Sequence, residues 1–285
     1  MNYSIIVPHK NAPELLQRCI ASIPQRDDVQ IIVVDDNSDE RKKPDVKRKG
    51  VEVILLDSVN SNGAGHARNV GLSHAKGKWI LFADCDDYYC DGFLSVLDKY
   101  KDQNLDVVYY HHYDVYGKEH RIVISIDKET WTDDEAIELK FRRLYPWNKM
   151  VCKSFINKYN IHFEECINGN DLFFTYQVAF FSKEFVIDPS RIYCYYHNPN
   201  SLTRNKKNSD EYYLSIFHHK FKCKQFVHYI GHAEWHKPLV LKFIAILYKK
   251  GGMAFLQSLK VYIQHYSELK KNRYEFVNYF SNCKI

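Results

Sequence analysis

The chain has 285 residues, 45% of them hydrophobic and 26% charged, which is the composition of a globular protein with a sizeable core. Its formal net charge is only +5 at pH 7, so the whole chain lacks the basic character of a nucleic-acid-binding protein and we expect no nucleic-acid partner. No stretch approaches the ~18 consecutive apolar residues of a membrane-spanning helix, so any membrane contact should be peripheral.

Short apolar runs alternate with amphipathic stretches in the first third of the chain. The apolar runs at residues 3–7, 30–34, 51–56 and 79–83 predict strands, and the spacing at residues 13–23 and 64–75 predicts helices. This alternation indicates a mostly parallel sheet flanked by helices. Ligands of such sheets bind beside the carboxyl ends of the strands, so those ends are the first candidates for a site.

The pattern changes in the rest of the chain. Residues 93–100 and 134–144 predict helices, residues 106–110 predict a strand, and residues 115–126 predict a hairpin around Gly117 and Lys118. From residue 211 the pattern is mostly helical, with a break at Gly251 and Gly252. Residues 205–285 carry 14 Lys or Arg and 5 Asp or Glu, a net charge of +9, which leaves −4 for residues 1–204. The acidic part suits a cation, and the basic part suits an anionic surface.

The eight cysteines are scattered, with no CxxC pair and no spacing typical of a zinc site. The first residues enter a strand pattern directly, without a charged leader and a long apolar core. We therefore expect reduced cysteines in a cytoplasmic protein.

An acidic cluster follows the run at residues 79–83. Asp84, Asp86 and Asp87 repel one another, and a cation or protonation must offset their charge. Carboxylate oxygens suit Mg²⁺ or Mn²⁺, which could stabilise a pyrophosphate as it leaves. The alternative is a solvated acidic turn that caps the next helix.

Two further segments could bind a nucleotide. Asp35 and Asp36 follow another apolar run, where a carboxylate can accept hydrogen bonds from a base or a ribose. Residues 62–69 form a glycine-containing loop that leads into a helix, where backbone N–H groups and Arg68 suit a phosphate. The alternatives are an Asx turn with a helix cap for the first segment and a tight turn for the second.

Asp171 lies between the polar residues 168–170 and the apolar residues 172–174. A carboxylate beside an apolar segment can be desolvated, which raises its pKa toward the range of a useful base. The alternative is an Asp that caps a helix.

The combination of these segments resembles the family 2 glycosyltransferases. The resemblance rests on Val7-Pro8, VVDDNS at 33–38, GHARNVGL at 65–72 and GKWILFADCDD at 77–87. It continues in PWNKMV at 146–151, in the segment that holds Asp171 and, more weakly, in residues 195–204, and so covers about residues 3–204. The chain departs from the family in Asn170-Asp171, where the family usually has Glu-Asp, and this removes a helper carboxylate. Cys85 lies between Asp84 and Asp86, at a position that need not bind anything.

The resemblance implies a GT-A fold, an α/β domain over residues 1–204 with a mostly parallel central sheet flanked by helices. Residues 1–110 would bind the nucleotide sugar, residues 111–204 would bind the acceptor, and residues 205–285 would form a basic helical extension. The implied reaction is an inverting transfer of a sugar, with a UDP-hexose as the default donor, to a hydroxyl of a glycan or lipid-linked acceptor in surface polysaccharide synthesis.

The resemblance also implies a role for each candidate residue. Asp171 would be the catalytic base. The residues near the nucleotide would be Pro8, Asp35 or Asp36, Arg68, Asn69 and Asp84. Mn²⁺ or Mg²⁺ would be bound by Asp86, with Asp87 and His197 as further candidate ligands.

Two other functions remain open from the sequence. An Asp- and metal-dependent nucleotidyltransferase or phosphotransferase would also place carboxylates and a cation at strand ends. A non-catalytic nucleotide-sugar-binding module could keep the same fold. The basic region could anchor the protein peripherally at the inner face of the cell membrane, or it could pack as a helical subdomain with a solvated basic face.

Overall fold

The computed structural model describes residues 1–122, 132–142, 145–166, 169–198, 222, 223 and 263. Contacts divide the chain into two compact units, Met1–Asn205 and Lys206–Ile285. The helical pattern expected after residue 211, its break at 251–252 and the last residues of the expected hairpin lie outside the described residues, except at 222, 223 and 263. In the described part of the chain, no helix is long and apolar enough to cross a lipid bilayer.

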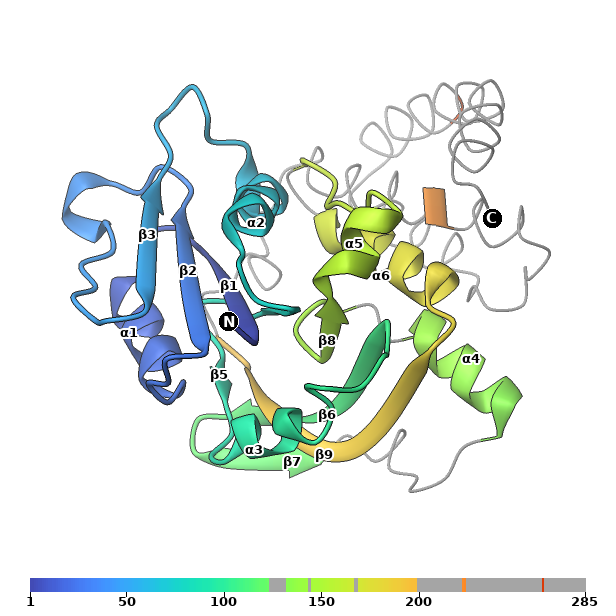
Figure 1. The fold of residues 1–285 in the computed structure, drawn as a ribbon. Helices are drawn as coiled ribbons and strands as arrows, with labels where there is room; N and C mark the ends of the chain where they lie inside the picture. Colours follow the sequence, from blue (N-terminus) through green and yellow to red (C-terminus); the bar gives the residue numbers. More distant parts are fainter. Residues whose placement is uncertain (123–131, 143–144, 167–168, 199–221, 224–262, 264–285) are drawn as a thin grey trace, which may run out of the picture. The chain divides into compact units, whose positions relative to one another are not determined.

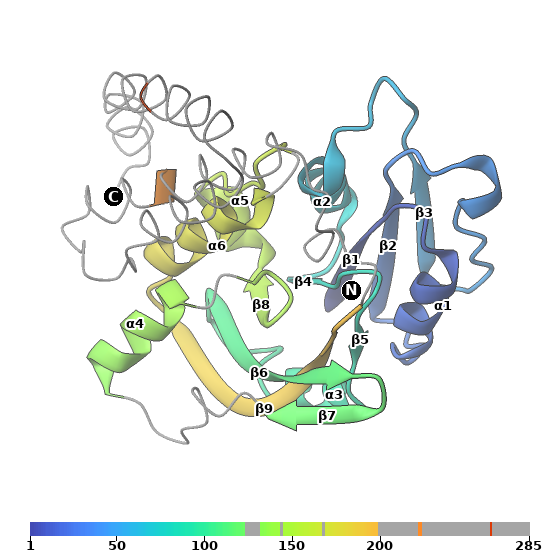
Figure 2. The same ribbon diagram turned by 180° about the vertical axis from the view of Figure 1, so that it is seen from behind.

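Four parallel strands form one half of the sheet, in the order β3-β2-β1-β4; Figure 1 labels the first three and Figure 2 also labels β4. They are β1 (Tyr3–His9), β2 (Val29–Asp35), β3 (Val51–Leu55) and β4 (Trp79–Phe82). Every residue of β1, β2 and β4 is buried, as expected for parallel strands covered on both faces. The chain runs from β1 outward to β2 and β3 and returns to β4 on the other side of β1. The ends of β1 and β4 therefore flank the point where the strand order reverses, the usual ligand site of such sheets.

Two helices connect the parallel strands. α1 (Pro13–Ala21) has Pro in its first turn and buries Leu16, Cys19 and Ile20. α2 (Gly63–His74) packs so closely on β1 that a Cβ atom on Gly71 would lie 2.4 Å from Ile6. The 3₁₀ helix η1 (Glu40–Lys42) follows β2. The α/β fold with a mostly parallel sheet and flanking helices, expected from the sequence, is confirmed.

The other half of the sheet contains antiparallel pairs. β8 (Lys149–Cys152) joins β4 to β6 (Val107–Tyr116) and is antiparallel to both. β6 lies beside the parallel strand β9 (Phe185–Tyr196), and the two form the long curved part of the sheet in Figures 1 and 2. β5 (Tyr88–Tyr89) pairs with β9, and β7 (Glu119–Ile122) forms with β6 the hairpin that Gly117 predicted. The sequence analysis did not predict β5, β8 or β9.

The remaining helices are α3 (Phe93–Asp98), α4 (Asp133–Arg142), α5 (Lys153–Lys158) and α6 (Asn170–Phe181). α6 is buried on almost every face, which is why its sequence lacks a polar side. Gly169 precedes it with φ = +81°, a conformation that glycine adopts without a steric penalty. This turn places Asp171 in the first turn of α6.

Candidate active site

The ends of β1 and β2 are joined by a buried hydrogen-bond network. His9 and Asp35 are partners across the two strands, and the His9 Nδ1 lies 2.7 Å from the Asp35 carboxylate. The His9 Nε2 accepts a hydrogen bond from the Ala12 N–H, so the ring proton is on Nδ1, and the Nδ1–H donates a hydrogen bond to the Asp35 carboxylate. The backbone N–H and the hydroxyl of Ser38 also donate to Asp35. At 1% exposure, Asp35 fixes the turn after β2 and presents no free surface.

Asp36 lies next in this turn and is also buried, at 5% exposure. Its carboxylate accepts hydrogen bonds from the Lys10 ammonium at 3.1 Å, the Ser61 hydroxyl at 2.8 Å and the Gly63 backbone N–H at 3.2 Å. The Lys10 side chain is 53% exposed, so a bound molecule can reach the rim of this cluster. Asp36 therefore holds the start of α2 beside the end of β1, where Pro8 is buried within the strand.

Arg68 links the acidic loop after β4 to the first turn of α6. Its guanidinium donates to the Asp84 carboxylate at 2.6 Å and to the Asn170 side-chain oxygen at 2.7 Å. Arg68 is 6% exposed and can span both groups because α2 passes very close to the segment before α6. A Cβ atom on Gly65 would lie 2.0 Å from the Glu164 carbonyl oxygen, so only glycine allows this approach.

Asp171 follows Asn170 and lies within reach of the charges on Arg68, Asp84 and Lys149. Burial raises the pKa of Asp171, and the negative charge of Asp84 raises it further, whereas Arg68 and Lys149 lower it. The net direction is upward, as the sequence predicted for a desolvated carboxylate. The structure thus brings Asp84, Arg68 and Asp171 together from three distant segments, and Asp171 is not remote from the acidic loop.

Asp84 and Asp86 are the partly exposed carboxylates of that loop. Burial raises the pKa of Asp86, and the charge of Asp84 adds to the effect. The Asn198 amide donates to Asp86 at 3.3 Å, and Arg18 donates to its backbone carbonyl. The Arg18 guanidinium also lies 4.3 Å from the centre of the Tyr196 ring, so α1 and β9 both support the loop.

Asp87 has a different environment from its neighbours. It is fully buried, and its two oxygens accept hydrogen bonds from the Tyr193 hydroxyl at 2.9 Å and the Tyr196 N–H at 2.7 Å. Burial raises the pKa of Asp87 well above its usual value, and the charges of Asp84 and Asp86 add to this. The carboxylate therefore joins the acidic loop to β9 and lies inside the protein, away from the surface that a cation would reach.

No preformed metal centre exists among the described residues, since no three His, Cys, Asp or Glu side chains there are grouped to hold an ion. His197 stacks on Tyr116 with ring centres 3.9 Å apart, and its Nε2 lies 3.3 Å from Asp114. Its chain neighbour Asn198, and not His197, contacts Asp86. A cation near Asp86 would need further ligands from a bound diphosphate or from water, which is common for Mg²⁺.

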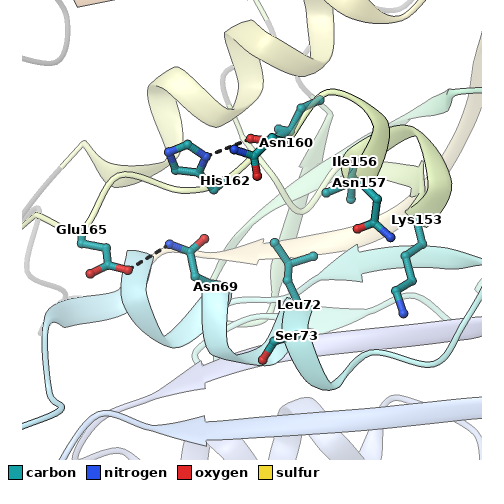
Figure 3. Close-up of a pocket in the computed structure, with 10 residues that line it drawn as sticks. Asn69, Leu72, Ser73, Lys153, Ile156, Asn157, Asn160, His162 and Glu165 are labelled. Atoms are coloured by element: carbon teal, nitrogen blue, oxygen red, sulfur yellow. Dashed lines mark hydrogen bonds between the residues drawn. The ribbon is translucent and has the colours of Figure 1, made fainter. Parts of the chain in front are cut away.

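Asn69 points away from this cluster toward a surface pocket of about 480 Å³ (Figure 3). Its amide binds both backbone groups of Phe163 and also donates to Glu165 at 3.2 Å. The pocket lies between α2 and α5, and of the predicted site residues it contains only Asn69. The structure therefore separates Asn69 from Arg68, the residue before it in the same helix, because Arg68 faces the acidic loop.

Sequence reasoning missed four residues that support the site. They are Arg18, Asn170, Tyr193 and Asn198, which contact the acidic loop or Arg68. Only Asn170 gave a signal, because it replaces an expected Glu beside Asp171. Its neutral oxygen still accepts the Arg68 hydrogen bond that a carboxylate would accept.

Comparison with known proteins identifies relatives of the chain. The sequence model of glycosyl transferase family 2 matches residues 4–164. A poly(ribitol-phosphate) beta-glucosyltransferase of Bacillus spizizenii is 28% identical over 207 residues, which are 69% of this chain and 32% of that protein. A GalNAc(5)-diNAcBac-PP-undecaprenol beta-1,3-glucosyltransferase of Campylobacter jejuni is 38% identical over 100 residues, 33% of this chain and 32% of that protein. The chain thus spans about a third of the length of both relatives.

A solved structure has the same fold. The crystal structure of Staphylococcus aureus TarS 1–349 in complex with UDP-GlcNAc matches with a TM-score of 0.64 at 23% identity. The match covers 80% of this chain and 66% of that one.

Proposed function

The chain belongs to glycosyl transferase family 2, and from this premise we propose that it is an inverting glycosyltransferase that uses a nucleotide-sugar donor. We propose a UDP-hexose as the donor and a hydroxyl of a glycan or a lipid-linked saccharide in bacterial surface polysaccharide synthesis as the acceptor. One observation carries the proposal: Arg68 joins Asp84, on the donor side of the sheet, to Asn170 beside the candidate base Asp171.

The donor would bind at the ends of β1, β2 and β4, where the strand order reverses. The UDP-GlcNAc complex of TarS, which shares the fold, supports a UDP-sugar as the donor class. In this arrangement Asp36 and Lys10 form the rim near the base, Asp35 holds the turn from inside, and Asp84 faces the ribose. Arg68 orients Asp84 through the 2.6 Å ion pair and places positive charge near the diphosphate.

Asp86 is our candidate for holding a divalent cation, Mn²⁺ or Mg²⁺. It is partly exposed, and the raised pKa reflects burial and the nearby charge of Asp84, an excess of negative charge that a cation would relieve. Such a cation would stabilise the negative charge of the departing nucleoside diphosphate. For Asp87 we propose a structural role in place of the metal-binding role expected from the sequence. For His197 we propose no direct metal contact, only indirect support of the acidic loop after β4.

Asp171 would accept the proton of the acceptor hydroxyl as that oxygen attacks the anomeric carbon. The bond from the hydroxyl oxygen to the anomeric carbon forms while the bond to the diphosphate oxygen breaks. A single displacement of this kind inverts the configuration at that carbon. The upward shift of the Asp171 pKa makes the carboxylate a better base near neutral pH.

Two observations support the proposed acceptor and location. The C. jejuni relative is named for an undecaprenol-linked saccharide, and the basic region 205–285 carries a net charge of +9. Together they support an acceptor at an anionic membrane surface, which the basic region would contact peripherally. A further observation concerns location alone: Cys19, Cys85, Cys90, Cys152 and Cys194 are free thiols, which fits the cytoplasmic location expected from the sequence.

A panel of nucleotide sugars, scored for release of nucleoside diphosphate with Mn²⁺ or Mg²⁺, tests the proposed function. We expect release from at least one UDP-sugar by the wild type, and a decrease of about 10²–10⁴-fold in the turnover of Asp171→Asn. The exposed Asp102 supplies a matched control, since Asp102→Asn changes a carboxylate outside the site. Release of pyrophosphate would favour the nucleotidyltransferase, and binding of UDP-sugars without turnover would favour the non-catalytic module.

A further inference from the structure

An exposed aromatic ring lies on the acceptor side of the proposed site. Tyr145 is 47% exposed, although it is one of the larger apolar side chains. Its ring is nearly parallel to that of Trp147, with centres 4.7 Å apart and planes 12° apart. Trp147 is 2% exposed and is in turn nearly parallel to Tyr193, at 4.7 Å and 10°. The exposed ring therefore has a rigid support that begins in the core.

This row of rings is joined to the acidic loop. The Tyr193 hydroxyl accepts the Asp84 N–H at 2.9 Å and donates to Asp87 at 2.9 Å. At the other end, burial of the hydroxyl raises the pKa of Tyr145, and the charges of Asp114 and Asp171 raise it further. Tyr145 thus lies close enough to the candidate base for the two to interact electrostatically.

The strand order places Tyr145 on the side opposite the nucleotide residues. It precedes β8, which lies beyond β4, whereas Asp35 and Asp36 follow β2 on the other side of β1. A nucleotide base beside Asp36 therefore lies away from this ring. The environment of the ring is also polar, since the Asp114 and Asp171 carboxylates act on it and His112 lies 6.3 Å away. This mixture of an apolar face and a polar surround is unsuited to a lipid chain.

The same loop contains a second unusual side chain. Asn148 is 1% exposed, and neither its amide nitrogen nor its amide oxygen has a hydrogen-bond partner among the residues that the structure describes. Buried amides are almost always hydrogen-bonded, because an unpaired one costs about 1–3 kcal/mol. Residues 145–148 thus combine an exposed ring with a buried amide that has hydrogen-bonding capacity to spare.

We propose that Tyr145 is the platform on which a pyranose ring of the acceptor stacks, next to Asp171. The inference rests on the proposed function and narrows the acceptor to a saccharide ring, in contrast to a ring-less polyol phosphate. One face of a pyranose carries mainly C–H groups, which pack on an aromatic ring, while its hydroxyls remain at the edge for polar partners. Because Trp147 holds Tyr145 in place, little side-chain entropy is lost on binding.

Saturation-transfer NMR tests this platform directly. The protein is mixed, with UDP present, with the methyl β-pyranosides of glucose, galactose and N-acetylglucosamine, and separately with ribitol as the ring-less probe. We expect saturation of the ring C–H protons of at least one pyranoside with the wild type and with Tyr145→Phe. The affinity of Tyr145→Ala should fall roughly tenfold, the order of an aromatic contact.

Two control variants test whether binding occurs at Tyr145 or elsewhere on the protein. Tyr159→Ala removes a half-buried aromatic ring that stacks on Phe181, away from the platform, and should bind as the wild type does. Asn157→Ala alters the pocket of Figure 3 and should also leave binding unchanged. Circular dichroism and retained UDP binding establish that Tyr145→Ala is folded.

Several results overturn the platform. They are equal affinity of Tyr145→Ala and the wild type, equal loss in Tyr145→Phe and Tyr145→Ala, loss of binding only in Asn157→Ala, and binding of ribitol alone. A wild type that binds none of the pyranosides overturns it as well. Hydrolysis of UDP-sugars to UDP is scored in parallel, so a wild type that binds pyranosides but releases no diphosphate contradicts the proposed function and not the platform.

Discussion

Replacing Arg68 with methionine removes the group that connects the donor and acceptor sides of the site. Methionine keeps most of the aliphatic stem, so the main loss is the guanidinium with its bonds to Asp84 and Asn170. A hydrogen bond in which at least one partner is charged contributes about 1.5–3 kcal/mol, and this range applies to both bonds of the Arg68 guanidinium. The Asp84 side chain is 31% exposed, so solvent reduces its share toward the lower end of that range. We expect Arg68→Met to lower the free energy of unfolding by about 3 kcal/mol.

The same change should move the pH dependence of the reaction. The positive charge of Arg68 lowers the pKa of Asp171, whereas burial and Asp84 raise it. Without that charge the pKa of Asp171 rises further. The base must be ionised to accept a proton, so kcat/KM declines as the pH falls through this pKa. The acid limb of the profile should therefore shift to higher pH in Arg68→Met.

Urea unfolding and a pH series of nucleoside diphosphate release measure the two effects. Arg68→Lys is the matched control, because it keeps the charge but cannot reach both partners. Its acid limb should stay near that of the wild type although its stability falls. Asn170→Ala removes only the bond from the guanidinium to the amide oxygen and should cost about 1.5 kcal/mol. The reasoning is refuted if Arg68→Met costs no more than Asn170→Ala, or if its acid limb coincides with that of the wild type.

The site and the basic region give four other predictions. Asp86→Asn and excess chelator should each abolish diphosphate release while the protein stays folded, and full wild-type activity in chelator would exclude a metal. Asp87→Ala should lower the free energy of unfolding by about 3 kcal/mol, because Tyr193 and Tyr196 lose a buried carboxylate; unchanged urea unfolding would contradict its structural role. Asn148→Leu should raise the free energy of unfolding by about 1–3 kcal/mol, since it removes a buried amide that has no partner among the described residues, and a clear loss of stability in urea would show that the amide is paired. The full chain should co-sediment with phosphatidylglycerol vesicles at low salt and much less at high salt, at about 1 kcal/mol per basic residue near the surface, and recovery in the supernatant under every condition would leave only the packed helical subdomain.

The parallel half of the fold could be predicted from the sequence because its signals are local. β1, β2 and β4 are mostly apolar, buried strands, and polar or acidic residues lie where the chain leaves the sheet. The turn at Gly117 was predictable for the same reason, since its φ of +62° favours glycine. A strand can be predicted from a few neighbouring residues when an apolar run and a residue that ends it lie next to each other in the sequence.

The second half was not predicted because its strands lack that pattern. β9 contains Asp188 and Pro189 within the strand, and β8 has only four residues before α5 begins. β8 forms hydrogen bonds with β4 and β6, and β9 forms them with β6. These partners lie far away in the sequence, so the residues of β8 and β9 alone do not predict strands. The same limit hid Tyr193 and Asn198, whose contacts with the acidic loop span more than a hundred residues.

The sequence by itself determined which residue types could form the site, and the tertiary structure decided what each side chain is free to do. Asp84, Asp86 and Asp87 are the same residue type and cannot be told apart in the sequence. Among them, only Asp87 is buried against β9, where each of its two carboxylate oxygens accepts a hydrogen bond from that strand. Arg68 and Asn69 are neighbours in the sequence, yet the helix turns one toward the acidic loop and the other toward Phe163. The physical reason is that a side chain's role depends on its burial and on the hydrogen bonds already made, and both are set by segments far away in the chain.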